Sequence, residues 1–524
     1  MQGFSTTAGI RQGCPLSPLL FALVADLLLR KLDRSFEGIL HRAYADDLAV
    51  VVADLGRALP GLVSLFSRFG LLSGLRLNLR KVMIVPLGDE GETDVVRQLS
   101  SAGPGWGAVQ VEERAKYLGF ILGPGKADHS WRQAIAKAHD RANAWAKLGL
   151  GLYFSILVYR VYVVSVLSFI GQLELPPNSW RQDEKKLFSK LFPGPNGWAR
   201  PDDFYGLKRD FGFPVEAPDF CTTIRAAKFR IAHREGRQVG DLCRNRWLRR
   251  LEEAWWRSEH AGRLGRWSEW FRTSYLRILT DNLWELEAKG ITLETVEGRV
   301  ARIMARPITP AQIEQIRMAT QKTANAMLRE QEVRNPASRL REKLKDTPLS
   351  VLPRVAADRA VQYLRRLQPL VPPRVWAASF RTYMGGWCTA SRFQRREPCL
   401  FGCRDHPDRR GHYLACPVLE EFGRRRLGLQ PTHEPAGRTT AMLGLSSTRT
   451  AEGDITRKAL LLAAAYRVHC TFRRRRDELQ GADTVWRALE QALRDLTKGH
   501  PKACAAVDSA WAASNTEVAV RRTA

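Results

Sequence analysis

The chain contains 524 residues, of which 44% are apolar, and it carries 82 Lys and Arg against 54 Asp and Glu. This length allows about two to four domains with separate cores, and the apolar content excludes a wholly disordered chain. The formal charge of +28 and the pI near 10.2 favour a polyanionic partner. Nucleic acid is the commonest such partner, and a merely solvated basic surface is the alternative.

Cysteine usage and apolar segments indicate the compartment. Nine cysteines are too few and too unevenly spaced for a secreted disulfide framework, and the N-terminus lacks the basic and apolar regions of a signal peptide. Residues 152–175 resemble a membrane span, but Arg160 lies near their middle, where a charge costs about 2.5 to 3.5 kcal/mol. We expect an intracellular protein without a membrane segment, in which these residues form a buried helix.

The first 125 residues contain five patterned segments. Residues 15–33 and 57–75 place apolar side chains at helical spacing, the first after a Ser-Pro start. Residues 43–52, AYADDLAVVV, predict a tight hairpin with two aspartates at the bend. Residues 75–87 alternate as a strand does, and residues 115–125 predict a further strand pair. This order indicates an α+β fold with helices on one face of an antiparallel sheet.

From about Asp128 onward the spacing is helical almost to the end of the chain. Pro-rich breaks at residues 176–177, 192–203 and 372–373 are candidate boundaries. The remainder is therefore predicted to be mostly α-helical.

Asp46 and Asp47 are adjacent like charges at the tip of an apolar segment. Holding both ionised there requires a multivalent cation. Mg²⁺, or Mn²⁺ in its place, suits hard oxygen ligands and shares them with substrate phosphates, as in two-metal phosphoryl transfer. The turn therefore predicts a metal-binding carboxylate pair, although this decapeptide alone also fits a solvated Asp-rich turn.

Four motifs, in family order within residues 9–119, resemble the palm of reverse transcriptases from non-LTR (LINE-type) retrotransposons. GIRQGCPLSPLLFAL at residues 9–23 resembles the block that enters the helix beneath the template and incoming nucleotide. YADD at residues 44–47 resembles the catalytic hairpin. GLRLNLRK at residues 74–81 is similar to the following Gly-Leu-x-x-Asn-x-x-Lys block, and KYLG at residues 116–119 resembles the primer grip.

The resemblance implies roles for individual residues. Asp46 would bind the catalytic metals, Asp47 would be a supporting ligand, and Lys81 would act near the leaving pyrophosphate as a cation or proton donor. A solvated lysine is the alternative for Lys81. The residues implied to lie near primer, template or nucleotide are Arg11, Gln12, Gly13, Tyr44, Tyr117 and Gly119. RNA and DNA are the implied partners, and dNTP is the implied substrate if the chain is active.

The chain also departs from the family. Reverse transcriptases carry a further aspartate on a strand upstream of the Arg-Gln-Gly block, and only residues 1–9 precede that block here. Asp26 lies within the predicted helix and cannot readily replace it. Because two metals on one hairpin would be under-coordinated, we expect a fragment truncated before the first catalytic palm motif, with little or no polymerase activity alone. The alternatives are a non-catalytic nucleic-acid-binding protein derived from a retroelement and a structural zinc protein with a vestigial palm.

A second constellation lies in CLFGCRDHPDRRGHYLAC, residues 399–416. Its candidate zinc ligands, in C-x3-C-x8-H-x3-C order, are Cys399, Cys403, His412 and Cys416. Four such ligands suit tetrahedral Zn²⁺ and leave no open position for a reacting water, which predicts a structural ion. Asp405 and His406 are possible substitutes within the loop, and free thiols are the alternative to a metal.

This site also resembles the retroelement family, whose chains often end in a Cys-Cys-His-Cys knuckle. The flanking residues Arg395, Arg396, Arg409 and Arg410 are candidates for phosphate contacts. The run at residues 473–476 fits a nuclear-import or RNA-contacting patch and equally a solvated helix face, and we expect a nuclear location. The predicted regions are a partial palm (1–125), thumb-like helices (126–178), a helical connection (179–371), the knuckle region (372–425) and a basic helical C-terminal region (426–524).

Overall fold

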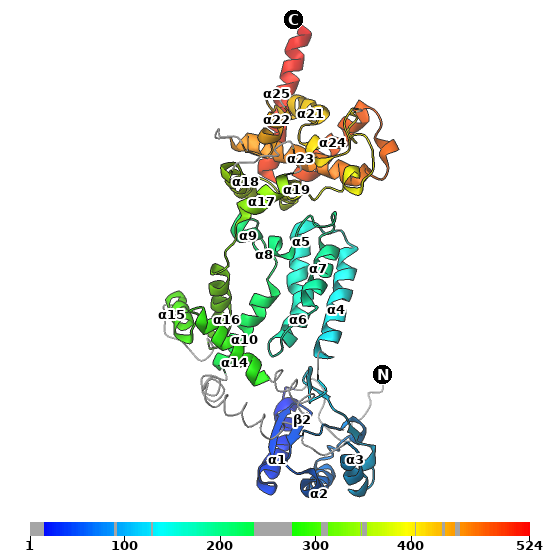
Figure 1. The fold of residues 1–524 in the computed structure, drawn as a ribbon, viewed down its shortest axis with the longest axis vertical. Coiled ribbons are helices and arrows are strands. Elements are labelled where there is room, and N and C mark those ends of the chain that lie inside the picture. Colours follow the sequence, from blue (N-terminus) through cyan, green and yellow to red (C-terminus); the bar gives the residue numbers. More distant parts are fainter. Residues whose placement is uncertain are drawn as a thin grey trace. The chain divides into compact units, whose positions relative to one another are not determined.

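The computed structural model describes residues 15–87, 92–126, 129–234, 275–304, 313–345, 347, 354–403, 405–431, 435–445 and 451–523. Contacts divide the chain into two compact units (Figure 1). Unit 1 holds the described residues within 1–133, 173–175 and 241–280, and unit 2 holds the rest. The five regions predicted from the sequence remain predictions.

Unit 1 combines short strands with helices. Its elements are α1 (Ser17–Ser35), β1 (Leu40–Tyr44), β2 (Asp47–Val51), α2 (Leu55–Ser73), a 3-10 turn (Leu79–Lys81), β3 (Met83–Ile84), α3 (Glu92–Ser101), a 3-10 turn (Trp106–Ala108), β4 (Gln110–Val111), β5 (Ala115–Tyr117) and β6 (Phe120–Leu122). The first turns of α4 and α14 also belong to it. The two predicted helices, the hairpin and the later strand pair are confirmed within one or two residues at most ends.

The sheet differs from its prediction. The described residues form three separate two-stranded sheets, and β3 pairs with β4 in parallel. Only Met83–Ile84 of the alternating run at 75–87 forms a strand, because residues 79–81 turn into a 3-10 helix. Leu79 thereby packs against the core of α2 and α3 instead of lying on a strand face. Among the described residues, the predicted antiparallel sheet is therefore present only as two separate antiparallel hairpins and one short parallel pair.

The hairpin β1–β2 has a core of its own. Leu28 and Leu32 of α1, Ile39 before β1 and Leu62 of α2 are buried together. Half-buried side chains of β2 pack against them. Asp54 caps α2 by accepting a hydrogen bond from the Arg57 N–H at 3.0 Å. Two helices and an apolar strand face thus fix the orientation of the hairpin.

A buried polar cluster joins distant segments of unit 1. Glu174, which is 3% exposed, accepts hydrogen bonds from the hydroxyls of Ser130 at 2.8 Å and Tyr275 at 3.3 Å. The Lys126 ammonium lies 3.8 Å from the same carboxylate and 4.1 Å from the centre of the Tyr275 ring. Burial lowers the pKa of Lys126, and Glu174 opposes that effect. This lysine, part of a GPGK sequence, is therefore a packing residue and has no phosphate-binding loop around it.

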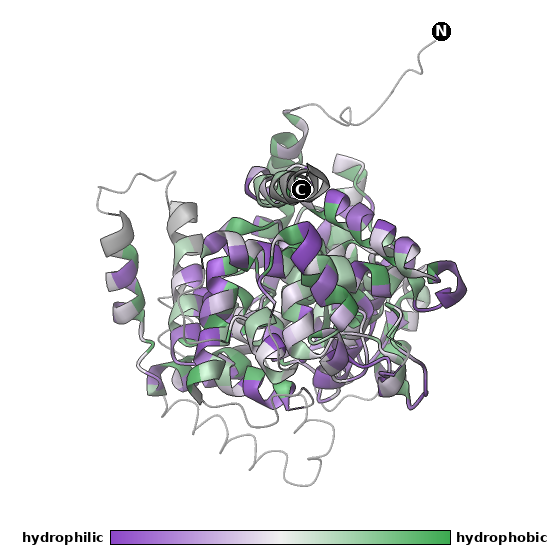
Figure 2. Cartoon of the chain, turned by 90° about the horizontal axis from the view of Figure 1, so that it is seen from above, coloured by the Kyte–Doolittle hydropathy of each residue, from purple (hydrophilic) through white to green (hydrophobic). Residues whose placement is uncertain are grey.

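Unit 2 is helical, as predicted for the chain after Asp128, and apolar and polar residues alternate around its helices (Figure 2). Its helices are α4 (His129–Ala146), α5 (Gly151–Val158), α6 (Val164–Gly171), α7 (Trp180–Leu191), α8 (Pro201–Tyr205), α9 (Leu207–Phe211), α10 (Phe220–Arg234), α14 (Tyr275–Ala288), α15 (Leu293–Met304), α16 (Ile313–Glu330), α17 (Pro336–Leu344), α18 (Arg354–Leu367), α19 (Pro373–Met384), α20 (Arg410–Tyr413), α21 (Pro417–Leu427), α22 (Pro435–Met442), α23 (Glu452–Phe472), α24 (Ala482–Thr497) and α25 (Pro501–Thr523). Single 3-10 turns cover Gln368–Leu370, Ala390–Phe393 and Arg476–Leu479.

Helices α5 and α6 are joined by a π-helical segment, Tyr159–Val163, into one stretch, Gly151–Gly171. This stretch has the length and apolar composition of a membrane span, and half of it is buried inside the protein. Core helices of soluble proteins share this length and composition, and the buried half agrees with the expected buried helix. Arg160 and Tyr162 lie on the exposed part.

The buried face of the π segment contacts an unusual carboxyl group. The Tyr159 hydroxyl donates a hydrogen bond to Glu184 Oε1 at 3.1 Å, and Glu184 is 8% exposed. Burial raises the pKa of Glu184 from 4.5 to about 7, although hydrogen bonds from Tyr205 and Tyr159 oppose the shift. The folded protein therefore favours the protonated carboxyl.

Replacing Glu184 by Gln should change the pH dependence of stability. Because the folded-state pKa is raised, the wild type loses stability as the pH rises from about 4.5 through about 7, whereas the amide does not. The free energy of unfolding of Glu184→Gln minus that of the wild type should therefore be larger at pH 8 than at pH 5, by up to about 3 kcal/mol. Urea unfolding at both pH values measures this difference. Glu294→Gln, at an exposed position of α15, is the control, and a pH-independent Glu184→Gln effect would refute the assignment.

Candidate catalytic hairpin and zinc site

The tip of the hairpin presents two carboxylates to solvent. Tyr44 pairs with Asp47 across the strands, so Ala45 and Asp46 form a two-residue turn. Ala45 has a φ of +50°, which residues other than glycine rarely adopt and which costs on the order of 1 kcal/mol. Asp46 and Asp47 are both exposed at this bend, and Tyr44 beside them is 68% exposed. A strained turn thus holds an accessible carboxylate pair.

The second hairpin of unit 1 lies against the first. The Tyr117 hydroxyl of β5 donates a hydrogen bond to the Arg42 carbonyl of β1 at 3.2 Å. The turn between β5 and β6 places Leu118 at a φ of +48° and Gly119 at +88°. The glycine suits that conformation, whereas the leucine is forced into it. The fold therefore brings Tyr117, predicted to lie near the primer, next to the strand that leads into the YADD sequence.

Other predicted palm residues lie on separate elements or outside the described residues. Lys81 ends a 3-10 turn and is exposed. Arg11, Gln12 and Gly13 lie outside the described residues. Asp26 forms an exposed ion pair with Arg30 at 2.6 Å on α1. Among the described residues, no third Asp, Glu, His or Cys joins Asp46 and Asp47 in a group that could hold a metal.

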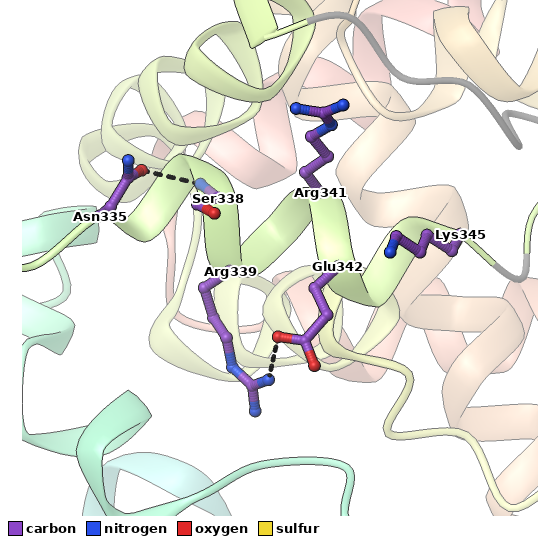
Figure 3. A pocket seen from close by; sticks show the side chains of 6 residues that line it. All are labelled: Asn335, Ser338, Arg339, Arg341, Glu342 and Lys345. Carbon is purple, nitrogen blue, oxygen red and sulfur yellow. Dashed lines mark hydrogen bonds and ion pairs between the residues drawn. The ribbon is translucent and has the colours of Figure 1, made fainter.

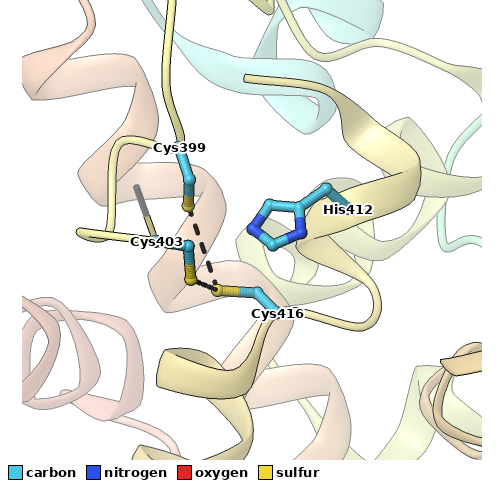
Figure 4. Close-up of side chains that lie close together, drawn as sticks. All are labelled: Cys399, Cys403, His412 and Cys416. Carbon is cyan, nitrogen blue, oxygen red and sulfur yellow. Dashed lines mark hydrogen bonds between the residues drawn. The ribbon is translucent and has the colours of Figure 1, made fainter. Parts of the chain in front are cut away.

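The described residues do contain one such group, in unit 2 (Figure 4). Its members are the predicted residues Cys399, Cys403, His412 and Cys416. One candidate ligand atom from each side chain lies within 4.8 Å of all the others. Cys399 and Cys403 bracket a tight loop, His412 projects from α20, and Cys416 precedes α21. The sequence prediction of these four residues is confirmed as a geometric cluster.

The cluster fits a zinc ion in two respects. At a Zn–S distance of about 2.3 Å, two thiolates of a tetrahedral site lie about 3.8 Å apart. The Sγ of Cys416 lies 4.0 Å from that of Cys399 and 3.4 Å from that of Cys403. The Nε2 atom of His412 is buried and has no hydrogen-bond partner, which is the environment of a ligand nitrogen. When bound, zinc would join three chain segments through all four residues and leave no position for a reacting water.

The buried carboxylate of Asp408 binds residues that flank the four-residue cluster. Asp408, 2% exposed, accepts hydrogen bonds from the Tyr413 hydroxyl at 2.7 Å and from Arg476 Nη2 at 2.6 Å. The Arg476 guanidinium also lies 3.0 Å from the Glu397 carboxylate and donates to the Pro398 carbonyl at 2.9 Å. Because Tyr413 follows His412 and Pro398 precedes Cys399, the Asp408–Arg476 pair joins both sides of the knuckle.

Helix α23 supplies a further residue beside Asp408. His469 is fully buried, and its Nε2 lies 3.5 Å from Asp408 Oδ1. Burial alone would raise the pKa of Asp408, but His469 and Tyr413 hold it below its ordinary value. Sequence reasoning assigned His469 no role and treated Arg476 as part of a surface patch. The position of Asp408 between the candidate ligands could have indicated such partners, because a carboxylate needs a partner once it is buried.

The arginines near the knuckle differ in their accessibility. Arg410, predicted to be available for phosphate contact, is 8% exposed and donates to the carbonyls of Thr382, Tyr383 and Lys343. It is therefore a structural donor, and the phosphate-contact prediction for it is wrong. His406 lies against His412, with ring centres 4.6 Å apart, but it is exposed and does not belong to the four-residue group.

A cavity of about 510 Å³ lies on helix α17, between its first and last turns (Figure 3). Several of its polar groups already have partners: Asn335 caps the helix at Ser338, and Arg339 binds Asp203 and Glu342. No residue of the hairpin or the knuckle lines it. The cavity is a feature of this helix surface, separate from both candidate sites.

The first prediction for the knuckle concerns its metal. Wild-type protein should contain one equivalent of zinc, and Cys403→Ser and His412→Ala should each lose most of it, because a tetrahedral site with three protein ligands binds more weakly. Cys221→Ser, which removes an exposed thiol of α10, is the matched control. Metal analysis of the purified variants measures the content. Zinc retained in both ligand variants would show that other residues bind it.

The second prediction concerns the support beneath it. Arg476→Gln leaves the buried Asp408 carboxylate with one charge fewer, and breaking buried pairs costs about 3–5 kcal/mol. Because the Arg476 side chain is 23% exposed, we expect a local loss of about 2 kcal/mol, seen as faster hydrogen exchange over residues 397–416. Arg475→Gln removes an exposed pair with Glu478 and a distant contact with the Phe472 ring, 6.0 Å to its centre, and should cost less than about 1 kcal/mol. Equal exchange in both variants would contradict the supporting role.

Comparison with known proteins finds a family match in the N-terminal part. Residues 2–122 match the family model for reverse transcriptase (RNA-dependent DNA polymerase). No solved structure matches the chain. The matched segment contains both hairpins and ends where β6 ends. The protein thus combines a segment that matches the reverse-transcriptase family with a Cys-Cys-His-Cys cluster in a helical unit.

Proposed function

We propose that the protein is an RNA-directed DNA polymerase fragment of the non-LTR retrotransposon type, with RNA and DNA as partners and dNTP as substrate of the completed enzyme. The observation that carries this proposal is the accessible Asp46–Asp47 pair at a fixed hairpin tip within the matched segment. Asp46 would bind Mg²⁺ or Mn²⁺, Asp47 would support it, and Lys81 would act near the leaving pyrophosphate. Arg11, Gln12, Gly13, Tyr44, Tyr117 and Gly119 would lie near primer, template or nucleotide.

Two observations support the view that the polymerase site is incomplete. The first is the lack, among the described residues, of a third carboxylate beside the hairpin. The second is an apolar stripe on α1 and the residue before it. Its exposed members, each 42–66% exposed, are Leu16, Leu19, Leu20, Leu23 and Leu27. A contiguous exposed apolar stripe is typical of a surface that binds another polypeptide. We propose that the fingers and first palm strand of the same enzyme type bind here.

The competing proposal is a retroelement-derived protein that binds nucleic acid without catalysis. It is favoured by the charge of +28 and by the structural character of the four-ligand cluster. Both proposals place the protein with nucleic acid inside the cell, and a nuclear location remains a prediction. They differ in whether the hairpin aspartates act in metal-dependent chemistry.

Primer extension distinguishes the two proposals. With RNA template, DNA primer, dNTP and Mg²⁺, we expect the chain alone to extend no more primer than Asp46→Ala does, because two carboxylates cannot hold both metals. Addition of a separately purified fingers-and-first-palm fragment should restore extension by the wild type and by Asp94→Ala. The latter removes an exposed aspartate of α3 and serves as the matched control.

The outcomes are distinct. Extension by the chain alone that depends on Asp46 would overturn the incompleteness of the site. Failure of every added fragment, combined with salt-dependent binding of RNA and DNA, would favour the non-catalytic protein. Failure to bind either nucleic acid would refute both proposals.

A further inference from the structure

The loop that leads into the knuckle exposes a phenylalanine. The 3-10 turn Ala390–Phe393 ends at Gln394, whose φ is +58°, and the Phe393 side chain is 54% exposed. Other aromatic residues nearby are buried: Trp387 is 2% exposed and Tyr413 is 3% exposed. Phe393 therefore contributes little to the core, and by itself an exposed phenylalanine would need no explanation.

The residues around Phe393 supply a second observation. Arg395 and Arg396 follow it and are exposed, as is Arg409 on the neighbouring segment. The Ser391 N–H donates to the Asp408 carbonyl at 3.1 Å, and the Asp408 N–H donates to the Glu397 carbonyl at 2.8 Å. These hydrogen bonds hold the two segments edge to edge. The backbone therefore places Arg409 beside the short exposed segment that carries Phe393, Arg395 and Arg396.

The local arginines fall into two classes. Arg392 donates to the carbonyls of Gly385 and Asn196, and Arg410 and Arg476 serve the buried contacts described above. Within the part of the chain that the structure describes, no carboxylate forms an ion pair with Arg395, Arg396 or Arg409. Their charge is directed to solvent, and Glu397, the nearest acid in sequence, is paired with Arg476.

We propose that Phe393, Arg395, Arg396 and Arg409 form a binding surface for single-stranded nucleic acid, in which a base stacks on Phe393 and the arginines contact the flanking phosphates. An accessible ring beside unpaired cations is the arrangement that recognises unstacked bases with little sequence preference. Duplex bases are stacked on one another and cannot use the ring. The zinc site and the Asp408 contacts fix the surface, so little order is lost on binding. This inference rests on the proposed nucleic-acid function and specifies where one strand binds.

Variants at Phe393 of the full-length, zinc-loaded protein test the stacking. A fluorescein-labelled single strand, as RNA and as DNA of the same sequence, and the matching DNA duplex are the probes. Phe393→Ala and Phe393→Leu should each weaken single-strand binding about tenfold, because both lose the aromatic face. Phe393→Tyr should bind as the wild type does, and duplex affinity should change less than about twofold in all three variants. Val355→Ala, at a 58% exposed position of α18, is the control for loss of surface apolar area.

Variants of the arginines test the phosphate contacts. Arg395→Gln combined with Arg396→Gln should reduce the slope of log affinity against log salt for single strands by about 0.7 for each phosphate that is no longer neutralised. Unchanged single-strand affinity in Phe393→Ala and Phe393→Leu, or equal reductions on single strand and duplex, would overturn the stacking. If the arginine variants still weaken binding in that case, the nucleic-acid function stands. If the wild type binds no probe, the proposed function itself fails. The control for folding is the zinc content of each variant, which should equal that of the wild type.

Discussion

The buried carboxylate of Asp408 organises the knuckle and the helices beneath it. A charge in such a position is costly unless donors surround it, and here a guanidinium, a phenol and an imidazole approach it from two separate parts of the chain. The same residue uses its backbone to join the loop before the knuckle to the loop inside it. Metal binding at the four-residue cluster would thus be coupled to helix packing, because both restrict the short segment between Cys399 and Cys416. This arrangement explains how a loop rich in Arg, Asp and Gly can present a defined surface.

Some of the arginines bind other groups of the protein itself. Arg381 donates to the Pro193 carbonyl and lies over the Trp198 ring, and Arg329 binds Glu216 and the Tyr205 carbonyl. Arginine suits this use because its five N–H donors can serve several acceptors in one plane. These guanidinium groups are therefore not available for direct contact with a polyanion. Only arginines without such partners, as beside Phe393, can contribute fully to binding.

Sequence patterns predicted the local elements that carry their own signals. The hairpin at residues 43–52, the helix at 15–33 and the Cys-Cys-His-Cys cluster were predicted because turn chemistry, helical spacing and ligand spacing are local properties. The parallel pairing of β3 with β4 was not predicted, since these strands are two residues each and their partnership depends on α3 between them. The roles of His469 and Arg476 were also missed. Their partner lies more than sixty residues earlier in the chain, and no spacing rule connects them.

The π-helical segment Tyr159–Val163 has a consequence for chain length. Each residue of an α-helix advances the side chains by about 100°, and a π turn accommodates one residue more than an α turn. Because the wider turn takes up the additional residue, α6 keeps nearly the rotation that a regular helix one residue shorter would give it. Loss of one residue within Tyr159–Val163 would therefore restore regular α-helical turns and leave Leu167 and Ile170 in the core. A regular α-helical turn holds no additional residue, so the same loss within α5 would rotate the side chains of α6 by about 100°. The π segment is thus the place in this stretch where the chain length can change without changing which face of α6 is covered.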